Sequence, residues 1–309
     1  MPTEGRILYS EHAQDILAIT LDLMRSGEPC ALVTSLNIEG GAARELGSLA
    51  VITATGDMTG YLSNGCIDRD IIHHGMAAID NGLVKHLRYG AGSPYLDLKL
   101  PCGGALELMI DPAPDLTVLE AALARLLNRE KTELSFSGRH GPVQIEYAPK
   151  PALILAGRGA IFRTTAQLAA HMDFELHLAS PDLEDLASLK VLNPTTQKSM
   201  TTPTATINLP IDAYSAVLLV FHDHEWEQAV LMQAAQQHPF FIGALGSRRT
   251  HAMRVERLKQ AGLSEAQCAQ IHGPIGLVPS LRNASLISVS ALAEITAKLP
   301  PSQIRLSSF

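Results

Sequence analysis

The sequence predicts an α/β protein with a mixed α+β N-terminal domain and a second domain built on a parallel sheet. Its 309 residues fit two domains of ordinary size. In the second half, apolar strands alternate with helices, and the first of these strands runs into a glycine turn. In the first half, short strands and tight turns surround three helices. We place the domain boundary between residues 148 and 149, giving domains 1–148 and 149–309.

Local patterns in the first half mark each element. Apolar residues at helical spacing follow Ser10, a candidate N-cap, and predict a helix that ends at Gly27. A second helix is predicted over residues 65–79, capped by Ser63 or Asn64, and a third over residues 116–127. Strands are predicted at 29–36, on both sides of the turn at 55–57, and at 83–90, 105–111, 132–138 and 143–148.

The second half reads as repeated strand–helix units. A continuous apolar strand at 152–156 enters a helix, and a second strand ends near Ser180. Further strands at 215–221 and 240–246 are each followed by a helix, which predicts a parallel sheet covered on both faces. The Thr/Pro-rich stretch at 193–212 has few apolar residues, so we expect a surface excursion that buries little.

Composition excludes several classes of protein. A net charge of −7 and a pI of 5.9 argue against non-specific nucleic-acid binding and a basic membrane-binding face. No apolar stretch approaches the ~20 residues of a membrane-spanning helix, and we expect no signal peptide. Four cysteines in so long a chain are no disulfide framework, so we expect a cytoplasmic protein with reduced thiols. Cys30 and Cys268 have apolar or helical neighbours and are expected to be inert.

Cys66 lies in the segment GYLSNGCIDRD, residues 60–70. We expect it in the first turn of the predicted helix, exposed and modestly activated by the helix dipole, with Asp68 and Asp70 partly opposing that effect. The alternative is a small buried cysteine that packs a tight turn.

A related pattern, LPCGG, places Cys102 before Gly103 and Gly104. The glycines allow a ligand to approach the backbone closely or allow a positive φ; the alternative is a strand-entry turn with a buried thiol. The spacing of Cys66 and Cys102 does not suit a structural zinc site. Two thiols brought together by the fold suit a soft metal, a sulfur-rich cofactor or a persulfide.

The segment AGRGAIF, residues 156–162, has the context of a dinucleotide-binding turn. Gly157 and Gly159 follow a strand and open a helix, but Phe162 replaces the third glycine. Ser180 stands where an acidic residue would bind a ribose hydroxyl, so the pattern does not favour NAD(P). A phosphate could still bind at this helix N-terminus; the alternative is a structural turn.

A stronger candidate for an anion site is GALGSRRTHAMRVERL, residues 243–258, which follows a strand. Backbone N–H groups, a hydroxyl and two guanidiniums at a helix start suit a phosphate or diphosphate. The candidate ligands are Gly246, Ser247, Arg248 and Arg249. We expect Arg254 and Arg257, further along the helix, to be solvated or at an interface.

A third strand end carries FHDHEWE, residues 221–227. His222 and His224 could bind a metal, although such pairs more often form hydrogen bonds in a strand-end turn. Ligands bind at the carboxyl ends of strands in open α/β sheets, so we expect the loops with Gly157, His222, Asp223 and Arg248 to share one crevice.

In this order, the segments GSLAVI, GYLSNGCID, RYGAGSPYLDLKLPCGG, FHDHEWE, GALGSRRTHAMRVERLKQAGL and IHGPIGL resemble the XdhC/CoxI family of xanthine dehydrogenase accessory proteins. The resemblance covers most of the chain. It implies a cofactor-associated N-terminal domain and a Rossmann-like C-terminal domain. It also implies a chaperone that binds molybdenum cofactor, protects it during installation of its sulfido ligand, and inserts it into a xanthine dehydrogenase-type molybdenum hydroxylase. An NAD(P)-dependent oxidoreductase with a degenerate fingerprint is the alternative.

The resemblance also implies roles and partners. Cys66 and Cys102 would contact the molybdenum end of the molybdopterin. The other candidate binding residues are Gly65, Asp68, Gly103, Gly104, Gly157, Gly159, His222, Asp223, Gly246, Ser247, Arg248 and Arg249, with the glycine turn and the arginines at the phosphate or nucleotide end. Expected partners are a xanthine dehydrogenase- or aldehyde oxidase-type client and a cysteine desulfurase. Apart from the resemblance, we expect a homodimer, since two glycine-rich faces could meet. Asn64 stands where family members usually have glycine.

Overall fold

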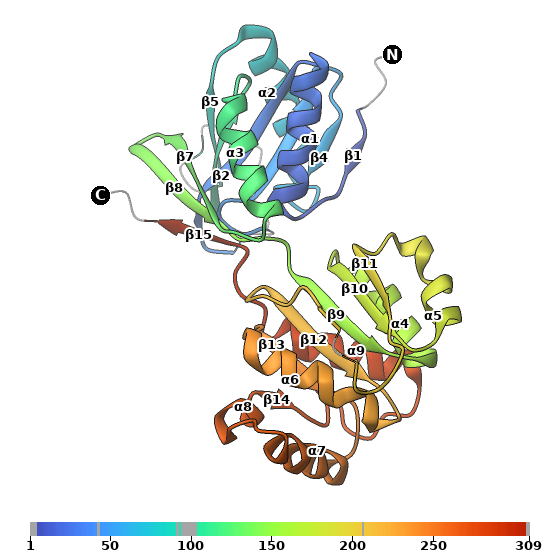
Figure 1. Ribbon diagram of the computed structural model, residues 1–309. Coiled ribbons are helices and arrows are strands. Elements are labelled where there is room, and N and C mark those ends of the chain that lie inside the picture. The colour runs from blue at the N-terminus through green and yellow to red at the C-terminus, as the bar shows by residue number, and fades with distance from the viewer. Residues whose placement is uncertain (1–4, 42–43, 91–92, 94–103, 206, 307–309) are drawn as a thin grey trace. The chain divides into compact units, whose positions relative to one another are not determined.

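The computed structural model (Figure 1) describes residues 5–41, 44–90, 93, 104–205 and 207–306. The chain forms two compact units, residues 1–149 with 301–309, and residues 150–300. The division lies next to the predicted boundary, but the C-terminal residues, which we assigned to the second domain, belong to the first unit. They form a strand, Gln303–Leu306, that pairs with residues 144–147. Its residues alternate between polar and apolar, but this run of four is short and was not predicted as a strand.

The first unit contains two sheets. The larger is mixed and has the strand order β1-β4-β3-β2-β6-β5. Its strands are β1 (Ile7–Leu8), β2 (Cys30–Glu39), β3 (Leu49–Thr53), β4 (Met58–Gly60), β5 (Lys85–Gly90) and β6 (Ala105–Asp111). The smaller sheet is antiparallel, in the order β15-β8-β7, with β7 (Thr132–Gly138), β8 (Gly141–Tyr147) and β15 (Gln303–Leu306).

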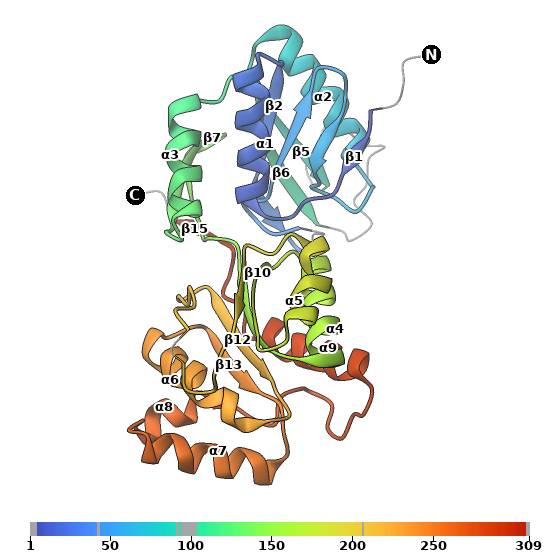
Figure 2. The same cartoon turned by 45° about the vertical axis from the view of Figure 1, so that its right-hand side comes forward.

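Helices cover both faces of the larger sheet. Helices α1 (Ala13–Ser26) and α3 (Leu116–Leu127) pack side by side on one face, and α2 (Asp68–Asn81) packs on the other (Figure 2). Helix α1 ends at Gly27, as predicted, in the left-handed conformation with φ 76°. Its N-cap is His12 rather than Ser10, because the His12 Nδ1 accepts the Gln14 N–H.

The second unit has the predicted parallel sheet, in the order β11-β10-β9-β12-β13-β14. Its strands are β9 (Ala152–Gly157), β10 (Glu175–Ser180), β11 (Thr196–Ser199), β12 (Ser215–Val220), β13 (Phe241–Ala244) and β14 (Ile271–His272). Helices α4 (Gly159–His171), α5 (Leu183–Ser188) and α9 (Ala284–Thr296) cover one face. Helices α6 (Glu227–Gln237), α7 (Arg248–Gln260) and α8 (Glu265–Ala269) cover the other. Short 3-10 turns, η1 (Lys190–Leu192) and η2 (His224–Trp226), complete the unit.

The Thr/Pro-rich stretch at 193–212 buries more than we predicted. It contributes β11 to the edge of the sheet, paired with β10. Four of its apolar side chains also enter the core on the α6 side: Met200, Ile207, Leu209 and Ile211. The prediction was wrong because it followed the Thr/Pro-rich composition. Ile207, Leu209 and Ile211 recur at every second position, which directs them to one side of an extended segment.

Candidate functional site

The parallel sheet has one topological switch point, between β9 and β12. From β9 the chain continues to β10 on one side, whereas from β12 it continues to β13 on the other. Val220, near the end of β12, pairs with Gly157 at the end of β9. Loops that leave such a point in opposite directions form the usual ligand site of an open α/β sheet. The predicted loops at 157–159, 221–227 and 245–249 all lie at this carboxyl edge.

The start of α7 presents two unneutralised arginines. Ser247 is the N-cap, and its Oγ accepts the Thr250 N–H at 3.1 Å. Gly246 has φ 148°, and a Cβ there would lie 3.0 Å from the Thr250 Cγ2, so glycine suits this turn. Arg248 and Arg249 are exposed, and neither has an ion pair within the described part of the chain.

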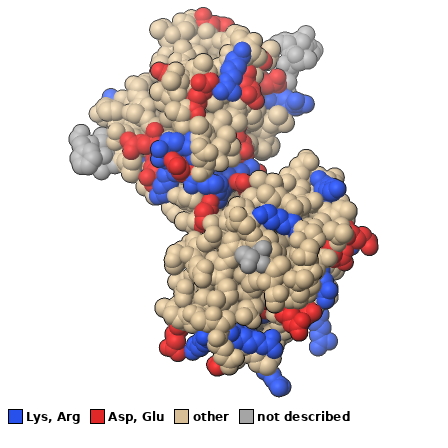
Figure 3. All heavy atoms as spheres, in the orientation of Figure 1, with Lys and Arg blue, Asp and Glu red and all other residues tan. Residues whose placement is uncertain are grey.

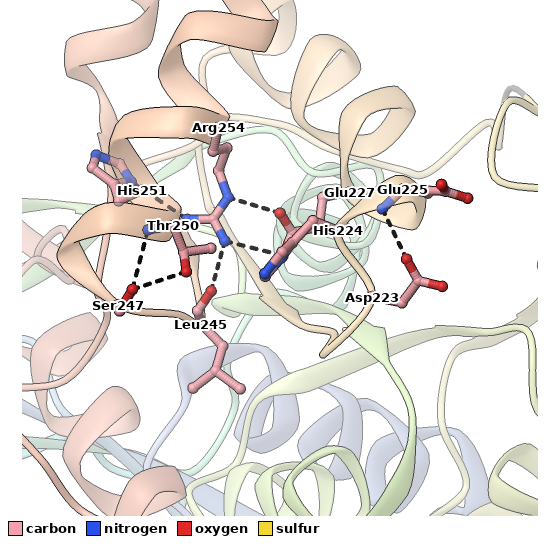
Figure 4. Close-up of polar contacts among 9 residues, drawn as sticks. All are labelled: Asp223, His224, Glu225, Glu227, Leu245, Ser247, Thr250, His251 and Arg254. Atoms are coloured by element: carbon pink, nitrogen blue, oxygen red, sulfur yellow. Dashed lines mark hydrogen bonds and ion pairs between the residues drawn. The ribbon is translucent and has the colours of Figure 1, made fainter.

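A buried ion pair holds this loop in place, as Figure 4 shows. The Arg254 guanidinium donates to both carboxylate oxygens of Glu227 at 2.7 and 3.0 Å, and to the Leu245 carbonyl at 2.6 Å. Both side chains are at most 4% exposed. Our prediction that Arg254 is solvated or at an interface was therefore wrong. It ties α7 to the start of α6 and to the loop after β13.

The two histidines in the loop after β12 have different surroundings. The His224 Nδ1 lies 3.0 Å from the Glu227 Oε1, whereas His222 is exposed. Asp223 caps η2 by accepting the Glu225 N–H. Within the described ranges, no three His, Cys, Asp or Glu side chains gather in a group that could hold a metal. His224 therefore shares the Glu227 carboxylate with Arg254, which is the hydrogen-bonded arrangement that we weighed against metal binding.

The N-terminus of α4 already holds an anion supplied by the chain. The Asp185 carboxylate is fully buried, accepts the Gly159 N–H at 2.5 Å and pairs with the Arg163 guanidinium. Gly159 has φ 79°, so it is required for its backbone conformation, and Gly157 is required because a Cβ there would lie 2.4 Å from the Val220 Cγ2. The fold itself therefore accounts for both glycines. The Gly159 N–H, which could otherwise bind a pyrophosphate, already donates to Asp185.

In the first unit, Cys66 lies in an exposed loop. The expected first-turn position was wrong, because α2 begins at Asp68 with Ile67 as N-cap. The buried Asp68 carboxylate accepts the N–H groups of Leu62, Ser63 and Gly65 at 3.0–3.2 Å. Asp68 therefore shapes the loop from inside, and the loop presents the thiol.

The same end of the larger sheet carries the second glycine motif. The Tyr89 hydroxyl donates to Asp70 of α2 at 2.6 Å, which places the start of α2 beside the end of β5. Gly104 precedes β6, next to the last residue of β5, and a Cβ there would lie 2.4 Å from the Glu39 carbonyl oxygen. Cys102 and Gly103 lie outside the described residues. Cys30 and Cys268, which we expected to be inert, are buried, and burial raises the pKa of the Cys30 thiol, with a smaller contribution from Glu28.

Sequence analysis missed the groups that organise these loops: Glu227, Arg254 and Asp185. Glu227 and Arg254 come from different helices, and Asp185 comes from the helix after β10. Only one signal was available. In a dinucleotide-binding strand–helix–strand unit, an acidic side chain after the second strand is expected near the glycine turn, where it binds a ribose. Asp185 instead binds the Gly159 N–H at the start of α4, where a phosphate would bind.

The chain matches the family model described as the XdhC Rossmann domain over residues 153–295, and that of the XdhC and CoxI family over residues 23–90. It is 30% identical to the molybdenum cofactor insertion chaperone PaoD of Escherichia coli K12, over 95% of this chain and 91% of that protein. It is 23% identical over 86% of its length to the uncharacterized protein YqeB of the same organism, of which the match covers 43%.

Among solved structures, the fold matches a crystal structure from Bacillus halodurans described as a xanthine dehydrogenase. The TM-score is 0.74, the match covers 91% of this chain and 94% of that one, and the sequences are 17% identical. At this identity the similarity shows a shared fold. No helix in the described part of the chain is long and apolar enough to cross a membrane.

Proposed function

The chain belongs to the XdhC and CoxI family, and we propose that it is a chaperone that binds molybdenum cofactor and inserts it into a molybdenum hydroxylase. The observation that carries this proposal is the 30% identity to PaoD over 95% of the chain. The match includes both units, so the whole protein, and not only its Rossmann domain, resembles an insertion chaperone.

The second unit offers suitable groups for the phosphate end of this cargo. Arg248 and Arg249 are exposed at the carboxyl edge of the sheet, and the Ser247 N-cap starts α7 between them and Gly246. Guanidiniums bind phosphate oxygens through paired N–H donors, and the helix N-terminus adds a favourable dipole. Because Asp185 already uses the start of α4, the start of α7 is the better anion site, and Gly157 and Gly159 support the fold.

The first unit offers a thiol for the metal end. Cys66 is exposed in a loop held by the buried Asp68, so its position is defined although it is accessible. Thiolates are good ligands for soft metals. We infer that Cys66, with Cys102, contacts the molybdenum end while a cysteine desulfurase supplies sulfur for the terminal ligand. The likeness to PaoD supports a molybdenum hydroxylase as the client. We propose a homodimer as the working form.

The proposal is tested by purifying the full chain from a host that makes molybdopterin and measuring the fluorescence of the oxidised pterin per mole of protein. We expect stoichiometric pterin, and transfer should activate a molybdenum hydroxylase prepared without cofactor. Wild-type protein that carries no pterin, even after incubation with the cofactor, would refute the function.

Two variants test the assignments within this function. R248A/R249A is expected to lower pterin retention about tenfold or more, since each lost charged hydrogen bond costs about 1.5–3 kcal/mol. K190A/R282A removes the same charge from exposed positions of the same unit and serves as the matched control. C66A is expected to lower both retention and client activation. Equal retention by R248A/R249A and the control would exclude the arginines, and full activation by C66A would exclude the thiol.

A further inference from the structure

The first unit contains a polar cavity that the proposed function does not use. Its volume is about 240 Å³. It is lined by parts of β2, β5 and β6, by the turn between β7 and β8, and by β15. The charged and titratable lining residues are Glu39, His86, Arg88, Glu107, Arg139, His140 and Arg305.

The cavity lies on the opposite face of the sheet from Cys66. Along β5, Leu87 and Tyr89 pack into the core under α2, the helix that follows the Cys66 loop. His86 and Arg88 alternate with them and line the cavity. The cavity therefore lies on the other face of the sheet from the helix that follows the Cys66 loop.

Its lining carries more positive than negative charge. Arg88 donates to Glu107 at 2.6 Å and to Glu39 at 3.0 Å, so the two carboxylates share one guanidinium. The Arg305 guanidinium donates to the neutral Asn37 side chain at 3.1 Å, and neither Arg305 nor Arg139 has an ion pair among the described residues. Figure 3 shows basic and acidic side chains lying side by side on the lower part of the first unit in this view. Two guanidiniums from different elements thus line a common space in which Glu39 and Glu107 are already paired with Arg88.

We propose that this cavity binds the phosphate group of a small phosphorylated molecule, with Arg139 and Arg305 as its cationic partners. The planar guanidinium fork matches phosphate oxygens, and the two arginines approach from a hairpin turn and from a separate strand. A water molecule takes up about 30 Å³, so the cavity has room for a phosphate or diphosphate group and a few further atoms, and it is smaller than typical sites for drug-sized ligands. The predominantly polar side chains at its wall do not suit an apolar ligand.

His86 provides a local reporter of occupancy. Burial lowers the pKa of His86, Arg139 lowers it further, and Glu107 raises it. Arg88, Arg305, Glu39 and His140 are the other charged or titratable groups that line the space. A phosphate bound beside His86 adds negative charge and is expected to raise its pKa by about one unit.

The test uses full-length protein with ¹³C-labelled histidine, and His86→Gln assigns the His86 signal. Phosphate, pyrophosphate and glycerol 3-phosphate are titrated against chloride and acetate at equal ionic strength. We expect a saturable shift of the His86 signal and a raised pKa with the phosphate probes only. Tighter binding of glycerol 3-phosphate than of phosphate supports an ester as the ligand, and the reverse supports the free anion. An equal response to chloride, or none that saturates, would overturn the proposal.

Two double variants complete the test. R139A/R305A, at exposed positions, is expected to weaken binding about tenfold or more. R139K/R305K keeps the charge but not the fork, and is expected to bind with intermediate affinity. R248A/R249A changes the second unit and should leave the His86 response intact, so that failure of the proposed function and failure of this inference are separate results. Unchanged binding by R139A/R305A would refute the inference.

Discussion

The buried Glu227–Arg254 pair makes the sharpest stability prediction. Glu227→Ala would leave a guanidinium that is 4% exposed without its carboxylate. Removal of one partner of a buried ion pair costs about 3–5 kcal/mol, because the remaining charge stays desolvated. In a unit of this size, 1 kcal/mol shifts the melting temperature by about 2–4 °C, so we expect the second unit to melt about 10 °C lower. The loop that carries Arg248 should loosen with it, since Arg254 also binds the Leu245 carbonyl.

The protein carries its own probe for this experiment. Trp226 is the single tryptophan of the chain and precedes Glu227, so its fluorescence during heating or urea titration reports on the second unit. Glu265→Gln is the control, because it breaks the exposed Lys259–Glu265 pair at the other end of α7 and should leave the transition nearly unchanged. The double variant E227L/R254M, which buries no lone charge, should recover much of the loss. A midpoint for E227A that moves no further than that of E265Q would refute the reasoning.

Three further predictions concern the second unit. Gly157→Ala is expected to lower the free energy of unfolding by about 1–3 kcal/mol, because its Cβ would lie 2.4 Å from a methyl group of Val220 in β12. Urea unfolding measures this, and an unchanged midpoint would show that the two strands can move apart without cost. Asp185→Ala should lower the melting temperature, and added phosphate should raise it more than in the wild type, since the vacated helix start can bind the anion; equal responses would argue against this site. Burial, with Arg254 and His272, lowers the pKa of His251, so the neutral form is favoured in the fold and stability should fall as the pH drops through about 6.5. His251→Asn should flatten that pH dependence of the melting temperature, and an unaltered slope would assign it to other groups.

Much of the fold follows from local patterns. Strands such as β9 and β12 are uninterrupted apolar runs, which only a sheet covered on both faces accommodates. The glycine after α1 marks its end because the left-handed conformation is favourable there. The prediction failed for residues 193–212 because it followed their polar composition and overlooked the alternation of Ile207, Leu209 and Ile211, whose side chains enter the core.

The candidate site likewise contains residues that could be predicted from the sequence and residues that could not. Its exposed groups, such as Cys66, Arg248 and Arg249, were predicted because each lies within a short motif whose chemistry is local. The buried side chains that hold those motifs in place, such as Glu227 and Asp185, were not predicted. Each binds a partner from another element, and sequence spacing does not indicate which element that is. Arg254 therefore looked like a solvated helix residue until Glu227 was seen beside it.

The sequence by itself determined the two-domain α/β architecture, the order of most strands and helices, and which loops carry thiols and arginines. Those features depend on periodicity and turn chemistry, which act over a few residues. Only the tertiary structure decided that Asp185 takes the anion position at α4, that β15 returns to the first unit, and that Arg139 and Arg305 face one cavity. These features depend on contacts between distant segments, whose free energy exists only once the chain has folded.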